Sequence, residues 1–126
     1  MRVLVVRAPV GGPIEVRDVG VAGTATWRGA VPPAGRIGTE VELNVLSDVD
    51  WNDISVGSAL LDIVPRRSNG LVIKGAVVDV DQYGVLTLDT GGGIVLLDTV
   101  GDPPLGIAGR PVELEVRDVE LFPVDP

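Results

Sequence analysis

The stretch GLVIKGAVVDVDQYGVLTLDTGGGIVLLDT, residues 70–99, predicts three consecutive strands joined by two tight turns. Runs rich in Val, Ile and Leu are typical of strands, and the clusters DQYG and GGG are typical of turns. Gly75 lies inside the long first run, where a glycine often marks a bulge or bend. A long bent strand that opens a three-strand meander favours a small barrel of the OB-like or SH3-like type.

Part of this pattern occurs twice in the chain. The segment PPAGRIGTEVELNVLSDVDW, residues 32–51, aligns without a gap with PPLGIAGRPVELEVRDVELF, residues 103–122, and eight of the twenty positions are identical. In each copy a turn rich in Pro and Gly precedes a strand with one apolar face. Those faces consist of Val41, Leu43 and Val45 in the first copy and Val112, Leu114 and Val116 in the second. The chain is therefore predicted to duplicate one β unit.

About four strands are expected in each half. They cover residues 2–8, 14–19, 23–29 and 40–47, and then 70–80, 84–90, 93–99 and 111–121. The first repeat spans 1–51, a linker or covering segment spans 52–69, and the second repeat spans 70–126. Ser58–Val64, inside the linker, could form a short helix or a further strand. Few strands bury little surface alone, so we expect the halves to pack as one compact unit, either as one barrel or as two modules.

The composition restricts the possible chemistry. The 126 residues suffice for one domain, and they include no Cys and no His. Thiol catalysis, disulfides, Cys/His metal sites and a histidine general base are thereby excluded, and we expect a protein without cofactor or enzymatic activity. The formal charge of −8 disfavours nucleic acid and favours a basic protein as partner.

The start of the chain, MRVLVVRAPVGGP, does not resemble a signal peptide, because Arg7 interrupts its apolar run. No apolar run reaches the length that spans a membrane. We therefore expect a cytoplasmic protein without membrane contact.

The triplet Asp89-Thr90-Gly91 is the one that carries the catalytic carboxylate of aspartic proteases. Such an enzyme needs two carboxylates that share a proton, so a single triplet would require a symmetric dimer. The alternative is a β-hairpin, because VLTLD and IVLLD flank three glycines that can supply the positive φ of a tight turn. The hairpin is the preferred interpretation.

Two groups of acids stand beside aromatic residues. In SDVDWND the acids are Asp48, Asp50 and Asp53 around Trp51, and in DVDQYG they are Asp79 and Asp81 before Tyr83. Aromatic anchors with acidic rims are typical of protein interfaces, so these seven residues are the candidate binding residues. Two alternatives stay open: Trp51 caps the core, as Phe122 would at the equivalent repeat position, and DVDQYG is a plain turn with a partial resemblance to a calcium loop.

The second half, GAVVDVDQYGVLTLDTGGGIVLLDTVGDPPLGIAGRPVELEVRDVELFP, resembles a group of short, acidic β-proteins of actinobacteria. The shared features are a VDxDGVLTL-like turn, a Gly-rich hairpin, GDPP and a closing strand that ends near Pro. VELNVLSDVDW in the first half fits the same pattern. The resemblance implies a fold, with no activity or catalytic residues to carry over.

Three functions follow as hypotheses. The first is a non-catalytic acidic binding module, in one version an immunity-type protein that neutralises a basic partner. The second is an OB-like binder of single-stranded nucleic acid, which would need a basic face such as Arg7, Arg17, Arg28 and Arg36. The third is a dimeric aspartic protease that uses Asp89. The sequence leaves the oligomeric state open.

Overall fold

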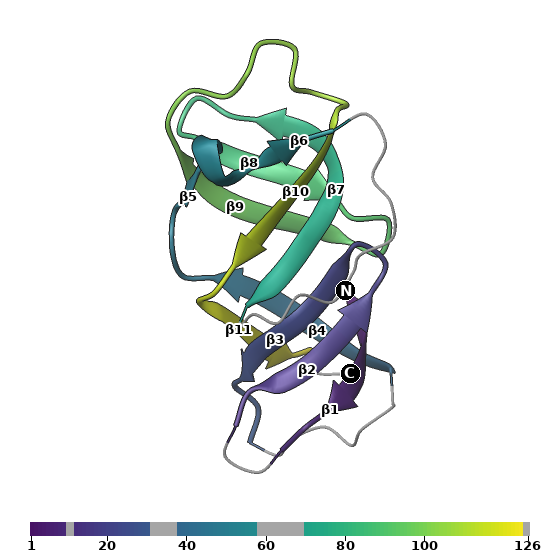
Figure 1. The fold of residues 1–126 in the computed structure, drawn as a ribbon. Helices are drawn as coiled ribbons and strands as arrows, with labels where there is room; N and C mark the ends of the chain where they lie inside the picture. Colours follow the sequence, from purple (N-terminus) through teal and green to yellow (C-terminus); the bar gives the residue numbers. More distant parts are fainter. Residues whose placement is uncertain (10–11, 31–37, 58–69, 125–126) are drawn as a thin grey trace.

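The computed structural model describes residues 1–9, 12–30, 38–57 and 70–124, and it confirms the predicted all-β, barrel-like fold (Figure 1). The strands within these ranges are β1 (Arg2–Arg7), β2 (Ile14–Asp18), β3 (Val21–Trp27), β4 (Gly38–Val45), β5 (Val49–Asp50), β6 (Ser55–Val56), β7 (Leu71–Val80), β8 (Val85–Asp89), β9 (Ile94–Val100), β10 (Pro111–Val116) and β11 (Val119–Pro123). A single turn of 3-10 helix, η1, covers Trp51–Asp53.

Five strands close into a barrel, which is the lower part of Figure 1. Strands β1, β2 and β3 form an antiparallel meander, and β4 pairs with the free edge of β1. The ring is closed by β11, which lies antiparallel to β4 and parallel to β3, with Leu121 opposite Leu43 on one side and Trp27 on the other. The last strand of the chain therefore completes the barrel of the first half.

The second unit, the upper part of Figure 1, repeats this arrangement with β7, β8, β9 and β10. The predicted meander is present, since β7, β8 and β9 pair antiparallel in sequence order and β10 pairs with β7. Strand β5 lies parallel to β9, with Val49 opposite Thr99, and β6 lies antiparallel to β10, with Val56 opposite Val112. The segment β5–η1–β6 thus holds the position that β11 holds in the barrel.

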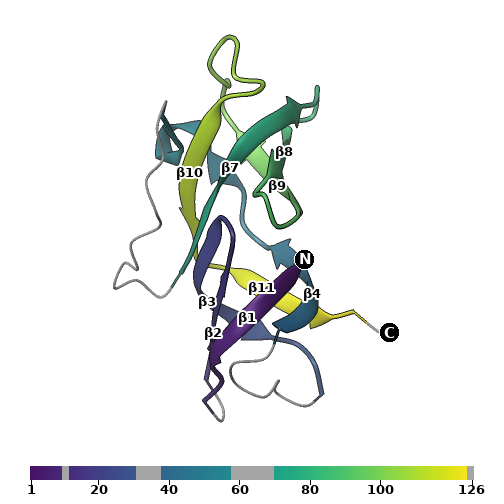
Figure 2. The ribbon, with the colours of Figure 1, turned by 90° about the vertical axis from the view of Figure 1, so that its right-hand side faces the viewer.

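The two halves exchange their closing segments. After β4 the chain leaves the barrel and pairs with the second unit, and after β10 it leaves the second unit and pairs with the barrel. The two crossing points touch, because the Leu46 amide donates a hydrogen bond of 2.8 Å to the Asp118 carbonyl. The spatial units therefore combine strands from both halves of the sequence, and Figure 2 shows both crossings between the units.

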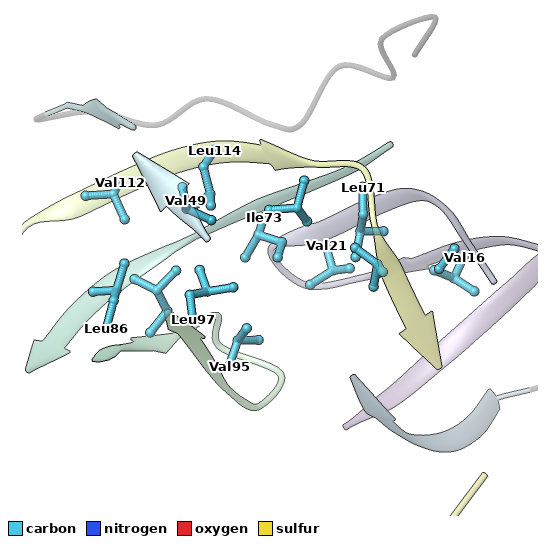
Figure 3. Packing of buried hydrophobic residues seen from close by; sticks show 14 of the residues in the cluster. Val16, Val21, Val49, Leu71, Ile73, Leu86, Val95, Leu97, Val112 and Leu114 are labelled. Carbon is cyan, nitrogen blue, oxygen red and sulfur yellow. The ribbon is translucent and has the colours of Figure 1, made fainter. Parts of the chain in front are cut away.

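One aliphatic core runs through both units. Leu71 and Ile73 of β7 are fully buried, and β7 pairs with β3 of the barrel over this stretch. Figure 3 shows these two side chains beside Val21, between Val16 on one side and Leu86 and Leu97 on the other. The alternation that predicted the strands is preserved in β9, where every second side chain is buried. Close packing of the two halves follows from this shared core.

Three local expectations were wrong. The strand predicted over 111–121 is two strands, because the chain crosses between the units at Arg117 and Asp118. The bulge of β7 lies between Val77 and Asp79, beyond Gly75. Gly75 instead allows a close approach, since a Cβ there would lie 2.5 Å from the Asp89 carbonyl oxygen. Phe122 is partly exposed and does not cap the core. The segment Ser58–Val64 lies outside the described residues.

Candidate functional site: an acidic cleft at the strand exchange

The crossing segments frame two adjoining cavities, which together we call the acidic cleft. A cavity of about 250 Å³ is lined by Ser47, Asp48, Val49, Asp50, Asp53, Glu115, Val116, Arg117 and Asp118. A cavity of about 380 Å³ is lined by Asp53, Ser55, Val72, Glu113, Leu114, Glu115 and Arg117. Asp53, Glu115 and Arg117 belong to both. The cleft therefore brings the predicted acids Asp48, Asp50 and Asp53 together.

Local hydrogen bonds fix the orientation of the first acids. The Asp50 carboxylate accepts a bond of 2.9 Å from the Asn52 amide and so caps the N-terminus of η1. Asp118, on the other crossing segment, accepts a bond of 2.5 Å from the Ser47 hydroxyl. Each of these carboxylates keeps acceptor capacity for a further donor, because an ionised carboxylate has about four lone-pair sites.

Half of the cleft lining could not be found from the sequence. Glu113, Glu115, Arg117 and Asp118 come from β10 and the second crossing, far along the chain from Asp53. The alternation in VELEV does predict that both glutamates point away from the core, but no local signal places them beside Asp53. Glu115 has a special feature: its Oε1 atom is buried without a hydrogen-bond partner. A buried carboxylate oxygen without a donor is costly in free energy.

Trp51 supports the cleft from the core. Its side chain is only 7% exposed, and the indole Nε1 donates a bond of 3.1 Å to the Thr99 hydroxyl. Thr99 in turn donates to the Gly84 carbonyl at 2.6 Å. The buried ring therefore anchors η1 on β9 and agrees with the core-capping alternative, whereas a surface contact would need an exposed ring.

The Trp51 anchor leads to a stability prediction. In Trp51→Phe the indole donor is lost and Thr99 keeps its bond to Gly84, so we expect a loss of about 1–2 kcal/mol in the free energy of unfolding. Chemical denaturation of the variant and the parent measures this loss. Tyr83→Phe, at an exposed ring, is the matched control and is expected to change the stability by less than about 0.5 kcal/mol. An unchanged midpoint for Trp51→Phe would show that the indole donor contributes nothing.

The second predicted group lies on the β7–β8 turn. The Asp81 carboxylate accepts bonds from the Tyr83 amide at 2.8 Å and the Val85 amide at 2.9 Å, so it forms the turn. Tyr83 is 81% exposed, and Asp79 is exposed as well. This turn adjoins η1 through the bonds from Thr99 to Gly84 and from Trp51 to Thr99. Asp79, Asp81 and Tyr83 therefore belong to a turn that is linked to Trp51 through Thr99, and none of the three lines the cleft.

The Asp-Thr-Gly triplet forms the predicted hairpin. Strands β8 and β9 pair with Asp89 opposite Ile94, and Gly91 has a φ of 88°. The exposed Asp89 carboxylate accepts a bond of 2.9 Å from the Gly91 amide. In this structure the Asp89 side chain stabilises the β8–β9 turn.

The basic face of the nucleic-acid hypothesis is only partly described. Arg7 and Arg17 are exposed on β1 and β2, and Arg28 forms an ion pair with Glu120 of β11. Arg36 lies outside the described residues. Six of the thirteen described residues that line the acidic cleft carry carboxylates, which repel phosphate.

In the described part of the chain, no group of three or more acidic side chains is arranged to hold a metal ion. A search of the same residues finds no helix with the length and apolarity needed to cross a membrane. No family model matches the chain, and no curated protein or solved structure shows significant similarity to it. The cleft itself is therefore the basis on which a function can be assigned.

Proposed function

We propose that this protein is a non-catalytic binding module that holds a basic segment of a partner protein in its acidic cleft. The observation that carries the proposal is the acidic lining of the two cavities, in which Asp53 and Glu115 belong to both. An Arg or Lys side chain of a partner would supply hydrogen-bond donors and a compensating charge to these carboxylates.

The charge distribution supports this assignment. Among the described residues, six carboxylates line the two cavities and Arg117 is the one basic residue beside them. They are Asp48, Asp50, Asp53, Glu113, Glu115 and Asp118. On the barrel, ion pairs join Met1 and Arg2 to Glu40 and Arg28 to Glu120. A cleft whose lining has more negative than positive charges attracts a cationic segment and accelerates its association at low salt.

The immunity-type version of this function, in which the basic partner is a toxin, rests on the net charge and the small size of the chain. The nucleic-acid and protease hypotheses have less support, because the cleft is acidic and Asp89 acts as a turn residue. The binding module therefore remains the function that we put to the test.

Binding of a synthetic Arg–Gly repeat peptide tests the proposal. Calorimetry at low salt is expected to show saturable binding that falls steeply as salt is added. The triple variant Asp48→Asn, Asp50→Asn, Asp53→Asn should weaken that binding roughly tenfold or more. Asn at position 50 can still cap η1, so the fold should be retained.

A matched variant separates the cleft from the net charge. Glu15→Gln, Glu42→Gln, Asp98→Asn removes the same number of charges outside the cleft lining. We expect it to bind the peptide nearly as the parent does. Equal weakening in both triple variants would reduce the interaction to non-specific attraction and contradict the proposal. A protein captured from lysate by the parent and the control variant, and lost by the cleft variant, would be the physiological partner.

A further inference from the structure

Comparison of the two units reveals an unoccupied strand position. In the barrel, the edge of β3 is filled by the first residues of β7, with Val21 opposite Ile73 and Gly23 opposite Leu71. The equivalent strand of the second unit is β9, which pairs with β8 along its length and with β5 only at Thr99 and Val100. Among the described strands, none pairs with this edge of β9 over residues 94–98.

The backbone groups on that edge point outward. Thr99 donates its amide proton to the Gly84 carbonyl, and Thr90 donates its own to the Gly93 carbonyl, so the odd-numbered residues of β9 bond toward β8. Antiparallel ladders alternate, and the even-numbered residues therefore direct their N–H and C=O groups away from β8. Ile94 and Leu96 thus present a free ladder edge, and their side chains are 58% and 61% exposed.

Strand β4 offers a second free edge. The Val41 amide donates to the Met1 carbonyl at 2.7 Å, whereas the Leu46 amide on the other side of β4 donates to Asp118. By the same alternation, Leu43 and Val45 direct their backbone groups toward the side on which Met1 lies. No described strand pairs with β4 on that side beyond Val41.

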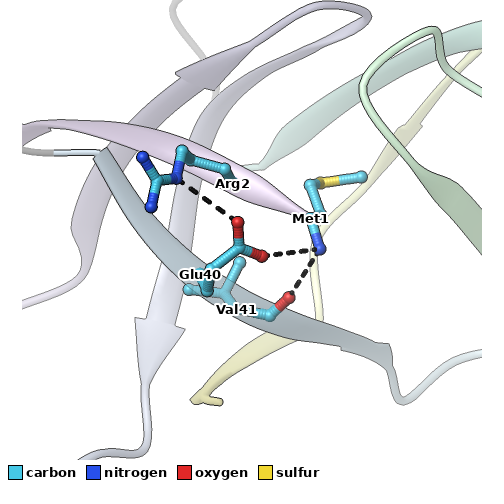
Figure 4. A network of polar contacts seen from close by, with 4 residues as sticks. All are labelled: Met1, Arg2, Glu40 and Val41. Atoms are coloured by element: carbon cyan, nitrogen blue, oxygen red, sulfur yellow. Dashed lines mark hydrogen bonds and ion pairs between the residues drawn. The ribbon is translucent and has the colours of Figure 1, made fainter. Parts of the chain in front are cut away.

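Met1 lies between the two edges, in contact with β4 and close to the residue that precedes β9. Its ammonium group donates to the Val41 carbonyl at 3.2 Å and lies 3.5 Å from the Glu40 carboxylate, which also pairs with Arg2 (Figure 4). A Cβ on Gly93, just before β9, would lie 3.3 Å from the Met1 Cβ. Figures 1 and 2 both show the N-terminus beside the β8–β9 turn.

Burial differs between the units where the strand is absent. Leu114 and Val116 of β10, which flank the first residues of β7, are 3% and 5% exposed. Their repeat equivalents on β4, Leu43 and Val45, are only partly buried. The strand that covers the core in one unit therefore has no described counterpart in the other.

We propose that the edges of β9 and β4 form a strand slot, bounded by Ile94, Leu96, Leu43 and Val45, that binds an extended apolar segment of a partner protein as an added strand. The segment runs antiparallel to β9, as β7 does to β3. Strand addition of this kind satisfies backbone groups on both edges. The slot is separate from the acidic cleft, and this inference stands independently of the proposed function.

The chemistry of the occupant follows from the slot and from its filled equivalent. The fold itself places Leu71-Val72-Ile73 in the equivalent position, which is an uncharged β-forming sequence. Asp98 and Glu42 flank the slot, so an acidic segment is disfavoured. A second copy of the chain fits less well. The slot has β9 on one side and β4 on the other, so it has room for one strand, whereas β9 of a second copy is already paired with its own β8.

The test uses the acetylated and amidated peptide Gly-Leu-Val-Ile-Ser-Gly, which copies residues 70–73. Titration into the ¹⁵N-labelled full chain is expected to give saturable amide shifts and slowed hydrogen exchange at Leu43, Val45, Ile94 and Leu96. The same peptide with an N-methylated Val loses the donor that faces β9, and we expect at least about tenfold weaker binding.

A variant with Gly-Leu-Val added before Met1 is the matched control. The added residues would occupy the slot from within the chain at high effective concentration, so binding of the free peptide should be lost while the fold is kept. Absence of shifts in the parent, or equal binding by the extended variant, would overturn the proposal. Shifts at these amides that depend on protein concentration without peptide would also overturn it, in favour of self-association.

Discussion

A chain ended after Asp118 is expected to lose the cooperative folding of the N-terminal barrel. The truncation removes β11, including the buried side chains of Val119 and Leu121, and opens the ring between β3 and β4. Loss of buried aliphatic side chains costs about 1–5 kcal/mol each, and the total stability of a domain is only about 5–15 kcal/mol. Thermal unfolding followed by circular dichroism, together with the dispersion of amide resonances, measures the effect.

A chain ended after Val124 is the control for this truncation. It keeps β11 whole and should unfold at nearly the parental temperature. Leu121→Ala gives a graded version, with an expected loss of about 2–5 kcal/mol. A truncated chain whose barrel resonances remain as dispersed as in the parent would show that β11 is dispensable and that the strand exchange does not determine the fold.

Gly20→Ala is expected to destabilise the protein by more than the strain of its own backbone conformation. Gly20 lies in the β2–β3 turn with a φ of 72°, a conformation that costs Ala about 1–2 kcal/mol. A Cβ there would also overlap the Lys74 carbonyl oxygen and lie 2.7 Å from the Thr90 carbonyl oxygen. Both carbonyl groups belong to the second unit, so the added methyl group would push the two units apart. We expect a total loss of about 3 kcal/mol or more in the free energy of unfolding.

Gly106→Ala separates the two causes of this loss. Gly106 has a similar φ of 70°, and a Cβ there would meet nothing within 4 Å. Its loss in the free energy of unfolding should therefore reflect backbone conformation alone, at about 1–2 kcal/mol. Urea denaturation of both variants gives the comparison. Equal losses for the two variants would mean that the β2–β3 turn does not press against the second unit.

The features of the fold that could be predicted are those that depend on residues close together in the sequence. The meander of β7, β8 and β9 follows from alternating apolar residues and from turn glycines such as Gly84 and Gly91, which have positive φ. The duplication was visible in the repeated VELxV strand, and the structure places the two copies at equivalent positions as β4 and β10. Turn chemistry and alternation act over a few residues, so they can be found without knowledge of the fold.

The candidate site was half predictable for the same reason. Asp48, Asp50 and Asp53 are close in the sequence and lie together in the cleft. Glu115 and Arg117 join them only because the chain crosses between the units at two points. The role of Trp51 could not be decided from the sequence, because a tryptophan serves as a surface anchor or as a core residue depending on what packs over it.

By itself the sequence determined the all-β class, the aliphatic core, the internal repeat and the acidic charge, because composition and short-range periodicity encode them. Only the tertiary structure decided that β5 and β6 pair with the second unit and that β11 closes the first. A strand pairs with any complementary free edge, and which edge it reaches depends on the burial of apolar faces across the whole molecule. That choice of partner edges created the acidic cleft at the crossing points and left the edges of β9 and β4 without a neighbouring strand in the described part of the chain.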